Sequence, residues 1–216
     1  MENGQFSLIY VYDALCGWCY GYSGVMKDIY EKYQDDFNFE VISGGMVLGE
    51  SAGPITNRSA LIKSHYPNVE ETSQVKFGEP FIKALDEGGI YLSSEKPSIA
   101  LSVFKTYLPD KAVLFAHALQ KALNFEGKDL SRDETYINLV PHFEINPDEF
   151  IEKLNSEEFK QAAYYDFALA RQLQVTGYPA AFIKTGDHHF YMIAKGYADL
   201  ETMELRIANV LKETIA

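Results

Sequence analysis

A chain of 216 residues suits one compact domain with an insertion and is long enough to bury a substantial core. Its 31 acidic residues outnumber its 19 basic residues and give a formal net charge of −12, which argues against a nucleic-acid partner. No apolar stretch approaches the length of a transmembrane helix, and residues 1–4 lack the basic and apolar segments of an export signal. We therefore expect a cytoplasmic protein that binds neither nucleic acid nor a membrane.

The first predicted elements are a strand, a helix and a second strand. Residues 7–12 are rich in β-branched and aromatic side chains and predict a buried strand. Residues 20–33 predict a helix, and residues 37–43 predict the second strand. The only two cysteines, Cys16 and Cys19, stand where the first strand gives way to the helix. A C-x-x-C pair at this point of a strand–helix–strand unit is typical of a thioredoxin-like redox site.

The spacing of the two cysteines has a mechanical reason. Two intervening residues let one helical turn bring the sulfurs within bonding reach, with one sulfur outward and the other behind it. Backbone N–H groups of the first turn, together with the helix dipole, stabilise a thiolate on Cys16. We therefore expect Cys16 to be the nucleophile and Cys19 to be the resolving thiol.

The cysteine pair could also belong to a zinc site or to an inert core. Structural zinc normally takes four protein ligands, but the sequence has no second C-x-x-C and its five histidines are scattered. The adjacent His188 and His189 are accounted for more simply by a solvated hairpin loop. An inert core accounts for one buried cysteine well and for two at this spacing poorly. We expect neither a metal nor a cofactor.

The middle of the chain carries helix signals and no convincing alternating strand. In the least regular part, residues 49–75, a helix is expected only at residues 58–65. Prolines and capping residues predict the other helices: residues 81–87, 98–107 and 111–125, helix starts at residues 131–134 and 146–149, and a long helix from residue 155 to about residue 174.

The C-terminal part returns to strands. Tyr178 and Pro179 directly precede the apolar residues 180–183, and proline is tolerated at the start of a strand or in the turn before it. A hairpin and a final amphipathic helix then follow. They comprise a second strand at residues 190–194, a turn at Gly186–Asp187, and a helix at residues 199–215 capped by Asp199.

The C-G-W-C motif at residues 16–19 and the proline before a core strand together resemble the DsbA-like branch of the thioredoxin superfamily. The chain is most similar to its C-G-W-C proteins, often described as predicted protein-disulfide isomerases. The resemblance implies an α/β, thioredoxin-like fold with a large all-helical insertion. It implies a thioredoxin-like domain made of residues 1–46 and 156–216, and a helical insertion domain at residues 47–155.

The same resemblance implies roles for particular residues. Tyr178–Pro179 would be a cis-proline loop opposite Cys16, with the Tyr178 backbone facing a bound thiol-containing chain. Trp18, the sole tryptophan, would offer an apolar surface to clients at the rim of the site, or simply cover that rim. The helical insertion would form the roof of the client-binding groove.

Four positions differ from the better-known relatives or support the site. Gly17 and Trp18 between the cysteines provide no imidazole to stabilise the thiolate. Position 10, where those proteins tend to carry a buried carboxylate, is Tyr10. Asp13 is the nearest acidic group, and we expect it to cap the turn before Cys16.

These observations favour an enzyme, a thiol–disulfide oxidoreductase or isomerase. Its partners would be thiol- or disulfide-containing proteins, with glutathione a further candidate. An alternative is a glutathione-dependent enzyme of the kappa-class transferase or hydroxychromene-carboxylate isomerase type. Those proteins share the fold but usually carry serine where Cys16 stands, so retention of both Cys16 and Cys19 argues against them. A third hypothesis is a binding module that keeps a disulfide for rigidity.

Overall fold

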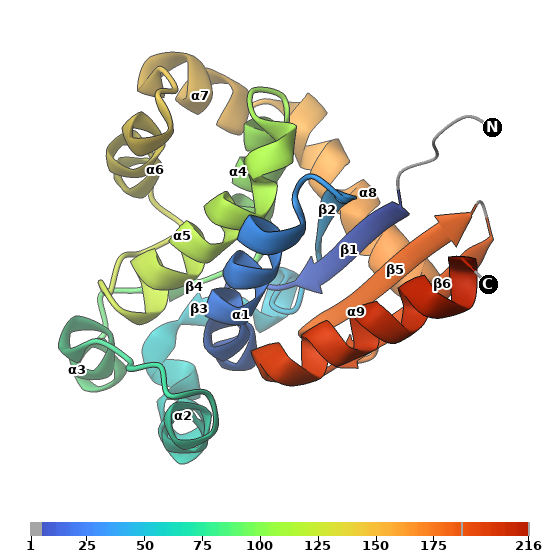
Figure 1. Ribbon diagram of the computed structural model, residues 1–216. Coiled ribbons are helices and arrows are strands. Elements are labelled where there is room, and N and C mark those ends of the chain that lie inside the picture. Colours follow the sequence, from blue (N-terminus) through green and yellow to red (C-terminus); the bar gives the residue numbers. More distant parts are fainter. Residues whose placement is uncertain (1–5, 187, 216) are drawn as a thin grey trace.

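The computed structural model describes residues 6–186 and 188–215, and it contains a four-stranded sheet at its centre (Figure 1). The strand order is β2-β1-β5-β6, with β1 and β2 parallel and the other two pairs antiparallel. The first two strands come from the N-terminal part and the last two from the C-terminal part. Their bounds are β1 (Phe6–Tyr12), β2 (Phe37–Ser43), β5 (Ala180–Gly186) and β6 (His189–Lys195). The expected α/β, thioredoxin-like sheet is therefore confirmed.

Strand β1 is buried on both of its faces, which explains its continuous apolar sequence. Leu8 and Tyr10 belong to the main core, whereas Ile9 and Val11 pack with Ala170 on the opposite face. Helices α1 (Gly17–Tyr33) and α9 (Leu200–Ile215) cover the first face, and α8 (Glu157–Gln172) covers the second. The period-two alternation of strand side chains thus supplies both halves of the core.

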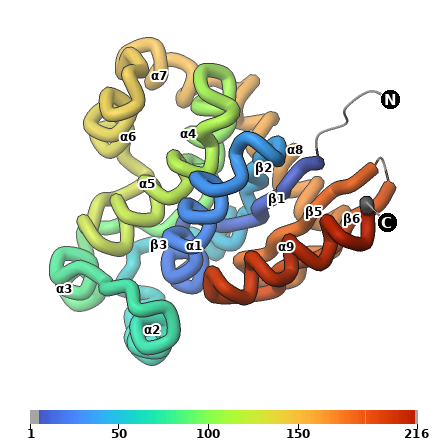
Figure 2. The backbone as a smooth tube through the Cα atoms, in the orientation of Figure 1, coloured from blue at the N-terminus to red at the C-terminus, as the bar shows by residue number. Residues whose placement is uncertain are grey.

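The chain between β2 and α8 forms the large insertion, which is helical apart from one short ladder. The ladder pairs β3 (Gly53–Pro54) with β4 (Tyr91–Leu92), so the expectation of an all-helical insertion is wrong at these four residues. Figure 2 shows α2 and α3 at the opposite end of the molecule from α6 and α7. The α-helices of the insertion are α2 (Ser59–Ser73), α3 (Glu79–Glu87), α4 (Glu95–Lys105), α5 (Ala112–Asn124), α6 (Asp133–Leu139) and α7 (Pro147–Leu154). Short 3-10 turns join them at Gly49–Ser51, Ile55–Arg58, Pro109–Lys111 and Val140–Phe143.

Several helices begin earlier or end later than the sequence indicates, and two cases have a clear physical reason. Helix α1 begins at Gly17 instead of residue 20, because Cys16 itself occupies the N-cap position. Helix α2 runs to Ser73 instead of residue 65, with Pro67 inside it. Proline removes one helical hydrogen bond, so it is a weak guide to a boundary wherever the neighbouring turns still pack.

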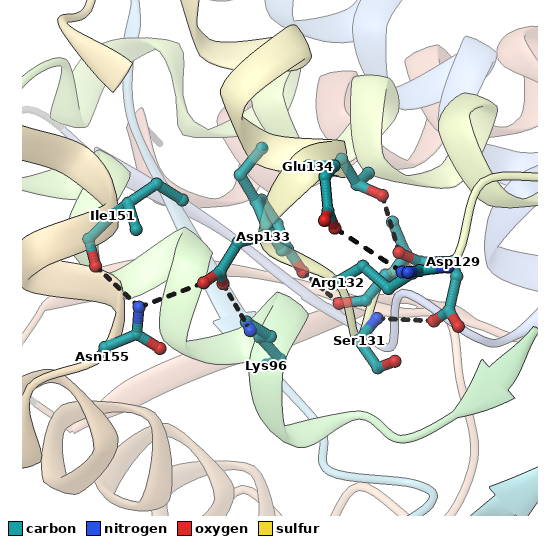
Figure 3. Close-up of polar contacts among 11 residues, drawn as sticks. Lys96, Asp129, Ser131, Arg132, Asp133, Glu134, Ile151 and Asn155 are labelled. Carbon is teal, nitrogen blue, oxygen red and sulfur yellow. Dashed lines mark hydrogen bonds and ion pairs between the residues drawn. The ribbon is translucent and has the colours of Figure 1, made fainter. Parts of the chain in front are cut away.

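The capping expected at residues 131–134 does not form. Helix α6 begins at Asp133, and its N-cap Arg132 makes no side-chain cap. Asp129 accepts the Ser131 N–H instead, at 2.8 Å. Figure 3 shows the Asp133 carboxylate between Lys96 Nζ, at 2.5 Å, and Asn155 Nδ2, at 3.4 Å. The acidic side chain therefore joins α4, α6 and the end of α7 rather than capping its own helix.

The remaining expected helix ends are partly confirmed. Asn146 accepts the N–H groups of Asp148 and Glu149 at 2.9 and 3.2 Å, as its sequence pattern predicts. The helix expected from residue 155, with a cap at its start, begins instead at Glu157, and its N-cap Ser156 makes no side-chain cap hydrogen bond. Asp199 caps α9, accepting the Thr202 N–H at 2.8 Å. Of the expected hairpin turn, Asp187 lies outside the described residues, as do the N-terminal residues 1–4.

Within residues 6–186 and 188–215, no helix is both long and apolar enough to cross a membrane.

Candidate active site

The two cysteines lie at the N-terminus of α1, where the turn after β1 fixes their backbone. The Cys16 N–H donates to the Asp13 carbonyl at 3.1 Å, and the Tyr20 N–H donates to the Cys16 carbonyl at 3.0 Å. The Cys16 sulfur accepts the Cys19 N–H at 3.4 Å. A sulfur at an N-cap receives both this N–H and the positive end of the helix dipole. The outer sulfur therefore occupies the N-cap of α1 and faces a backbone N–H donor.

The two sulfurs differ in their access to solvent. Cys16 is 8% exposed and borders a pocket, whereas Cys19 is fully buried. Both cysteines are free thiols. Burial, followed by the neighbouring Cys16, raises the pKa of the Cys19 thiol well above its ordinary value. The outer sulfur is thus accessible for attack, and the inner one remains protonated and shielded behind it.

The loop before β5 brings Tyr178 and Pro179 to Cys16, although they lie far apart in sequence. The Tyr178–Pro179 peptide bond is cis, as the family resemblance implies. The Cys16 thiol donates to the Tyr178 carbonyl, with the sulfur 3.6 Å from the oxygen. The Tyr178 hydroxyl in turn donates to the Gly44 carbonyl at 2.8 Å, which anchors the ring over the loop after β2. Backbone polar groups of this loop therefore lie directly beside the outer sulfur.

Asp13 does more than cap the turn. Its carboxylate accepts the Leu15 N–H at 3.0 Å, as expected, but also the Met46 N–H at 2.7 Å and the Ser94 hydroxyl at 2.9 Å. The side chain is only 1% exposed, and burial raises the pKa of its carboxyl group against the opposing effect of these hydrogen bonds. Gln120 donates to the Asp13 carbonyl at 2.7 Å. One buried residue therefore ties the cysteine turn to the loop after β2 and to the insertion.

The floor behind Cys19 is aromatic. Tyr10 is 1% exposed, and its ring lies 5.4 Å from that of Tyr12 and 5.9 Å from that of Tyr22. Burial raises the pKa of the Tyr10 hydroxyl well above its ordinary value, and that hydroxyl has no hydrogen-bond partner among the described residues. Tyr10, Tyr12 and Tyr22 all interact electrostatically with Cys19, so neutral rings line this side of the inner sulfur.

Trp18 and Gly17 lie on the pocket side of the pair. Trp18 is half-buried, with its ring 6.3 Å from that of Tyr197, and it lines the pocket with Cys16. A Cβ atom at Gly17 would lie 3.6 Å from the Phe77 ring. Trp18 therefore both packs against the segment before α9 and presents an apolar surface beside the outer sulfur.

A pocket of about 300 Å³ opens beside Cys16. The insertion supplies most of its lining, chiefly α2 with Arg58 just before it, and the loop after β2 supplies Met46 and Val47. The sequence does not mark these residues as part of the site, because they lie on a loop or in the stretch around α2, whose pattern is the least regular of the chain. Among the described residues, no cluster of three or more His, Cys, Asp or Glu side chains could hold a metal ion. The arrangement is suited to thiol–disulfide exchange with a molecule held between the pocket and the Tyr178 loop.

Comparison with known proteins supports the fold described above. The model of the family described as Thioredoxin matches residues 90–204, more than half of the chain, including Tyr178 and Pro179 but not the cysteines. No curated protein sequence matches the chain. Among solved structures, a candidate protein disulfide isomerase from Nitrosomonas europaea is similar, with a TM-score of 0.84 and 22% identity over 97% of this chain and 98% of that chain.

Two other solved structures bear on the alternatives. The cytosolic disulfide reductase DsbM from Pseudomonas aeruginosa with GSH has a TM-score of 0.77 and 17% identity, covering 95% of this chain and 98% of that one. A 2-hydroxychromene-2-carboxylate isomerase has a TM-score of 0.68 and 11% identity, covering 96% of this chain and 97% of that one. At these identities the likeness concerns the fold.

Proposed function

This chain belongs to the thioredoxin family and has a DsbA-like fold, and on that premise we propose that it is a thiol–disulfide oxidoreductase or isomerase acting on protein clients through Cys16 and Cys19. The observation that carries the proposal is the pairing of an N-cap sulfur with a backbone carbonyl from a distant loop, at 3.6 Å. The pocket leaves Cys16 approachable while Cys19 stays buried behind it. An inert structural pair has no need of this asymmetry.

The chemistry proceeds in two exchanges. The Cys16 thiolate attacks a client disulfide, forming a mixed disulfide and releasing the second client sulfur as a thiolate with the bonding electron pair. The thiol of Cys19 then loses its proton and attacks Cys16, which closes the Cys16–Cys19 disulfide and releases the client thiol. The client is reduced by two electrons and the protein is oxidised by two. Run in reverse, the same steps oxidise a client dithiol.

The backbone of Tyr178 gives the client a place to bind. A client segment running past this loop can add to it as a short extended strand, with its own sulfur directed at Cys16. In the free protein the Cys16 thiol donates to the Tyr178 carbonyl. When a client binds, this hydrogen bond is replaced by one from the client backbone to the same carbonyl. Trp18 and the pocket lie on the other side of the same sulfur.

The proposal also assigns a cellular compartment and a small-molecule partner. We place the activity in the cytoplasm and include glutathione as a candidate small partner, since the similar DsbM structure is of a cytosolic reductase with GSH. A glutathione-dependent isomerase remains the second candidate function, because the hydroxychromene-carboxylate isomerase shares the fold. The pair of cysteines favours the dithiol mechanism, since an isomerase of that type requires no resolving thiol.

The test uses three proteins and one disulfide-containing client such as insulin. With a reductant present, the native protein should reduce the client catalytically and Cys16→Ser should not. Cys19→Ser should form a mixed disulfide through Cys16 and fail to release it. Equilibration in glutathione buffers, followed by trapping of free thiols, then gives the direction of electron flow. Full activity of Cys16→Ser would refute the proposal.

A further inference from the structure

The lining of the pocket beside Cys16 differs in charge from the rest of this acidic protein. The chain carries 31 acidic residues among 216, yet none of them lines the pocket. Its walls are largely apolar, with Trp18, Leu61 and Phe77 among them. Arg58 and His65 are its basic residues. In a chain with a net charge of −12, this surface attracts basic groups less than the rest of the molecule does.

Arg58 provides a positive charge without a protein counter-charge. Its guanidinium donates to the Ser51 carbonyl at 3.1 Å, and in the described parts of the chain no carboxylate pairs with it. The side chain is partly buried at the pocket. A guanidinium binds carboxylates through two parallel hydrogen bonds, so the remaining donors of Arg58 suit an acidic group on a bound molecule.

The size of the pocket limits its occupant. A volume of about 300 Å³ is at the lower end of the range for ligand sites, about 300–1,000 Å³. It suits one large side chain and part of its neighbour. Because Cys16 itself is in the lining, this side chain must lie close to the sulfur that exchanges.

We propose that this pocket selects clients whose reactive cysteine is flanked by a bulky apolar residue, with an acidic residue next to it that binds Arg58. The inference rests on the proposed function and specifies its substrate class. The apolar side chain fills the space between Trp18 and α2, and the carboxylate lies at the Arg58 end. The chemistry stays that of the first exchange: the Cys16 thiolate bonds to the client sulfur, and the former partner of that sulfur leaves as a thiolate.

The test isolates this first exchange in the Cys19→Ser protein. The substrates are four short peptides, each with one cysteine held as a mixed disulfide with 2-thiopyridine, whose release is followed by absorbance. The two residues after the cysteine are phenylalanine–glutamate, phenylalanine–glutamine, alanine–glutamate or alanine–glutamine. We expect the phenylalanine–glutamate peptide to react about tenfold faster than its glutamine counterpart, the effect of a hydrogen bond to a charged group. Each peptide with alanine should react more slowly than the peptide with phenylalanine and the same following residue.

Two variants assign each preference to its residue. Arg58→Gln should remove the advantage of glutamate and keep that of phenylalanine, and Leu61→Ser should do the opposite. Leu61 is 55% exposed, so its replacement should not unfold the protein. Arg132→Gln is the matched control, because Arg132 precedes α6 at the end of the molecule away from α2 (Figure 1).

The outcomes separate the two proposals. Equal rates for all four peptides would overturn the inference and leave the proposed function standing. The absence of reaction with every peptide would refute the proposed function itself. The 2-pyridyl disulfide of glutathione is a fifth substrate. If it reacts faster than all four peptides, and Arg58→Gln removes that advantage, the pocket holds glutathione and the client inference is wrong.

Discussion

Replacing Gly44 by alanine perturbs the loop that faces Cys16 without altering either sulfur. A Cβ atom at Gly44 would lie 2.2, 2.3 and 2.6 Å from Cζ, Cε1 and the hydroxyl oxygen of Tyr178, all far inside van der Waals contact. The same ring is held by its hydrogen bond to the Gly44 carbonyl, and the Tyr178 carbonyl accepts from Cys16. The ring must therefore swing away, which breaks the hydrogen bond and shifts the backbone beside the sulfur.

The expected cost follows from the two contributions. The lost hydrogen bond costs about 0.5–1.5 kcal/mol, and overpacking typically costs about 1–3 kcal/mol. Because Tyr178 is only half-buried, its ring can move, and we expect a combined loss near the lower end of the sum, about 1.5–2.5 kcal/mol in the free energy of unfolding. For a chain of this size that lowers Tm by about 3–10 °C. Thermal unfolding measures the loss, and the peptide exchange assay should show a slower reaction of Cys16.

Gly177→Ala is the matched control, since it adds the same methyl group one residue before Tyr178. A Cβ atom there meets nothing within 4 Å, so the free energy of unfolding should change by less than about 0.5 kcal/mol. A Gly44→Ala, Tyr178→Ala double variant should lose less stability than the sum of its single variants, because the clash is gone. If Gly44→Ala behaves like Gly177→Ala in both assays, the Tyr178 ring does not hold this loop.

Three further predictions concern other contacts. Iodoacetamide should modify Cys16 in the native protein and the fully buried Cys19 only after unfolding, as peptide mass mapping would show; equal labelling would contradict the geometry. Burial raises the pKa of Asp13 above 3.8, so its contribution to stability is complete below that pH and is lost as the pH rises through the raised pKa. Between pH 3.8 and the raised pKa, the free energy of unfolding measured with urea should therefore fall less steeply with pH in the Asp13→Asn variant than in the native protein. Lys105→Met leaves the 7%-exposed Asp166 without its cation at 2.9 Å and should cost about 3 kcal/mol in urea unfolding. Adding Asp166→Leu should recover only part of this loss, because the leucine leaves the Ser43 N–H without its acceptor.

The parts of the fold that follow from local pattern could be predicted. Strand β2 has the expected bounds, and β1 begins one residue earlier than expected, because apolar and β-branched runs report burial directly. Helix α1 begins three residues early because its cap is a sulfur, a group outside the usual set of capping side chains. The cap at residues 131–134 fails because Arg132, not Ser131, occupies the N-cap of α6, while the Ser131 N–H donates to Asp129. The contacts of Asp133 with Lys96 and Asn155 were equally unpredicted, since tertiary contacts leave no local pattern in the sequence.

The candidate site also combines residues that the sequence predicts with residues that it does not. Cys16 and Cys19 are visible from their spacing, and Tyr178–Pro179 from the proline before a strand and the family resemblance. The Ser94 hydroxyl, which donates to Asp13 across 81 positions of sequence, carries no signal of its own. The pocket was hidden for a related reason, since a helix with a proline inside it supplies much of its lining.

Asp13 connects the cysteine turn with the wall of the pocket. The hydrogen bonds from Met46 and Ser94 to its carboxylate fix the cysteine turn relative to the loop after β2 and to the start of α4. Met46 also lines the pocket, so the position of the pocket wall and that of Cys16 depend on the same buried group. An exposed surface residue could not hold both, because competing water would weaken each hydrogen bond. The burial of a carboxylate at this turn is therefore explained by geometry: it holds the Cys16 turn and the pocket wall at Met46 in a fixed relative position.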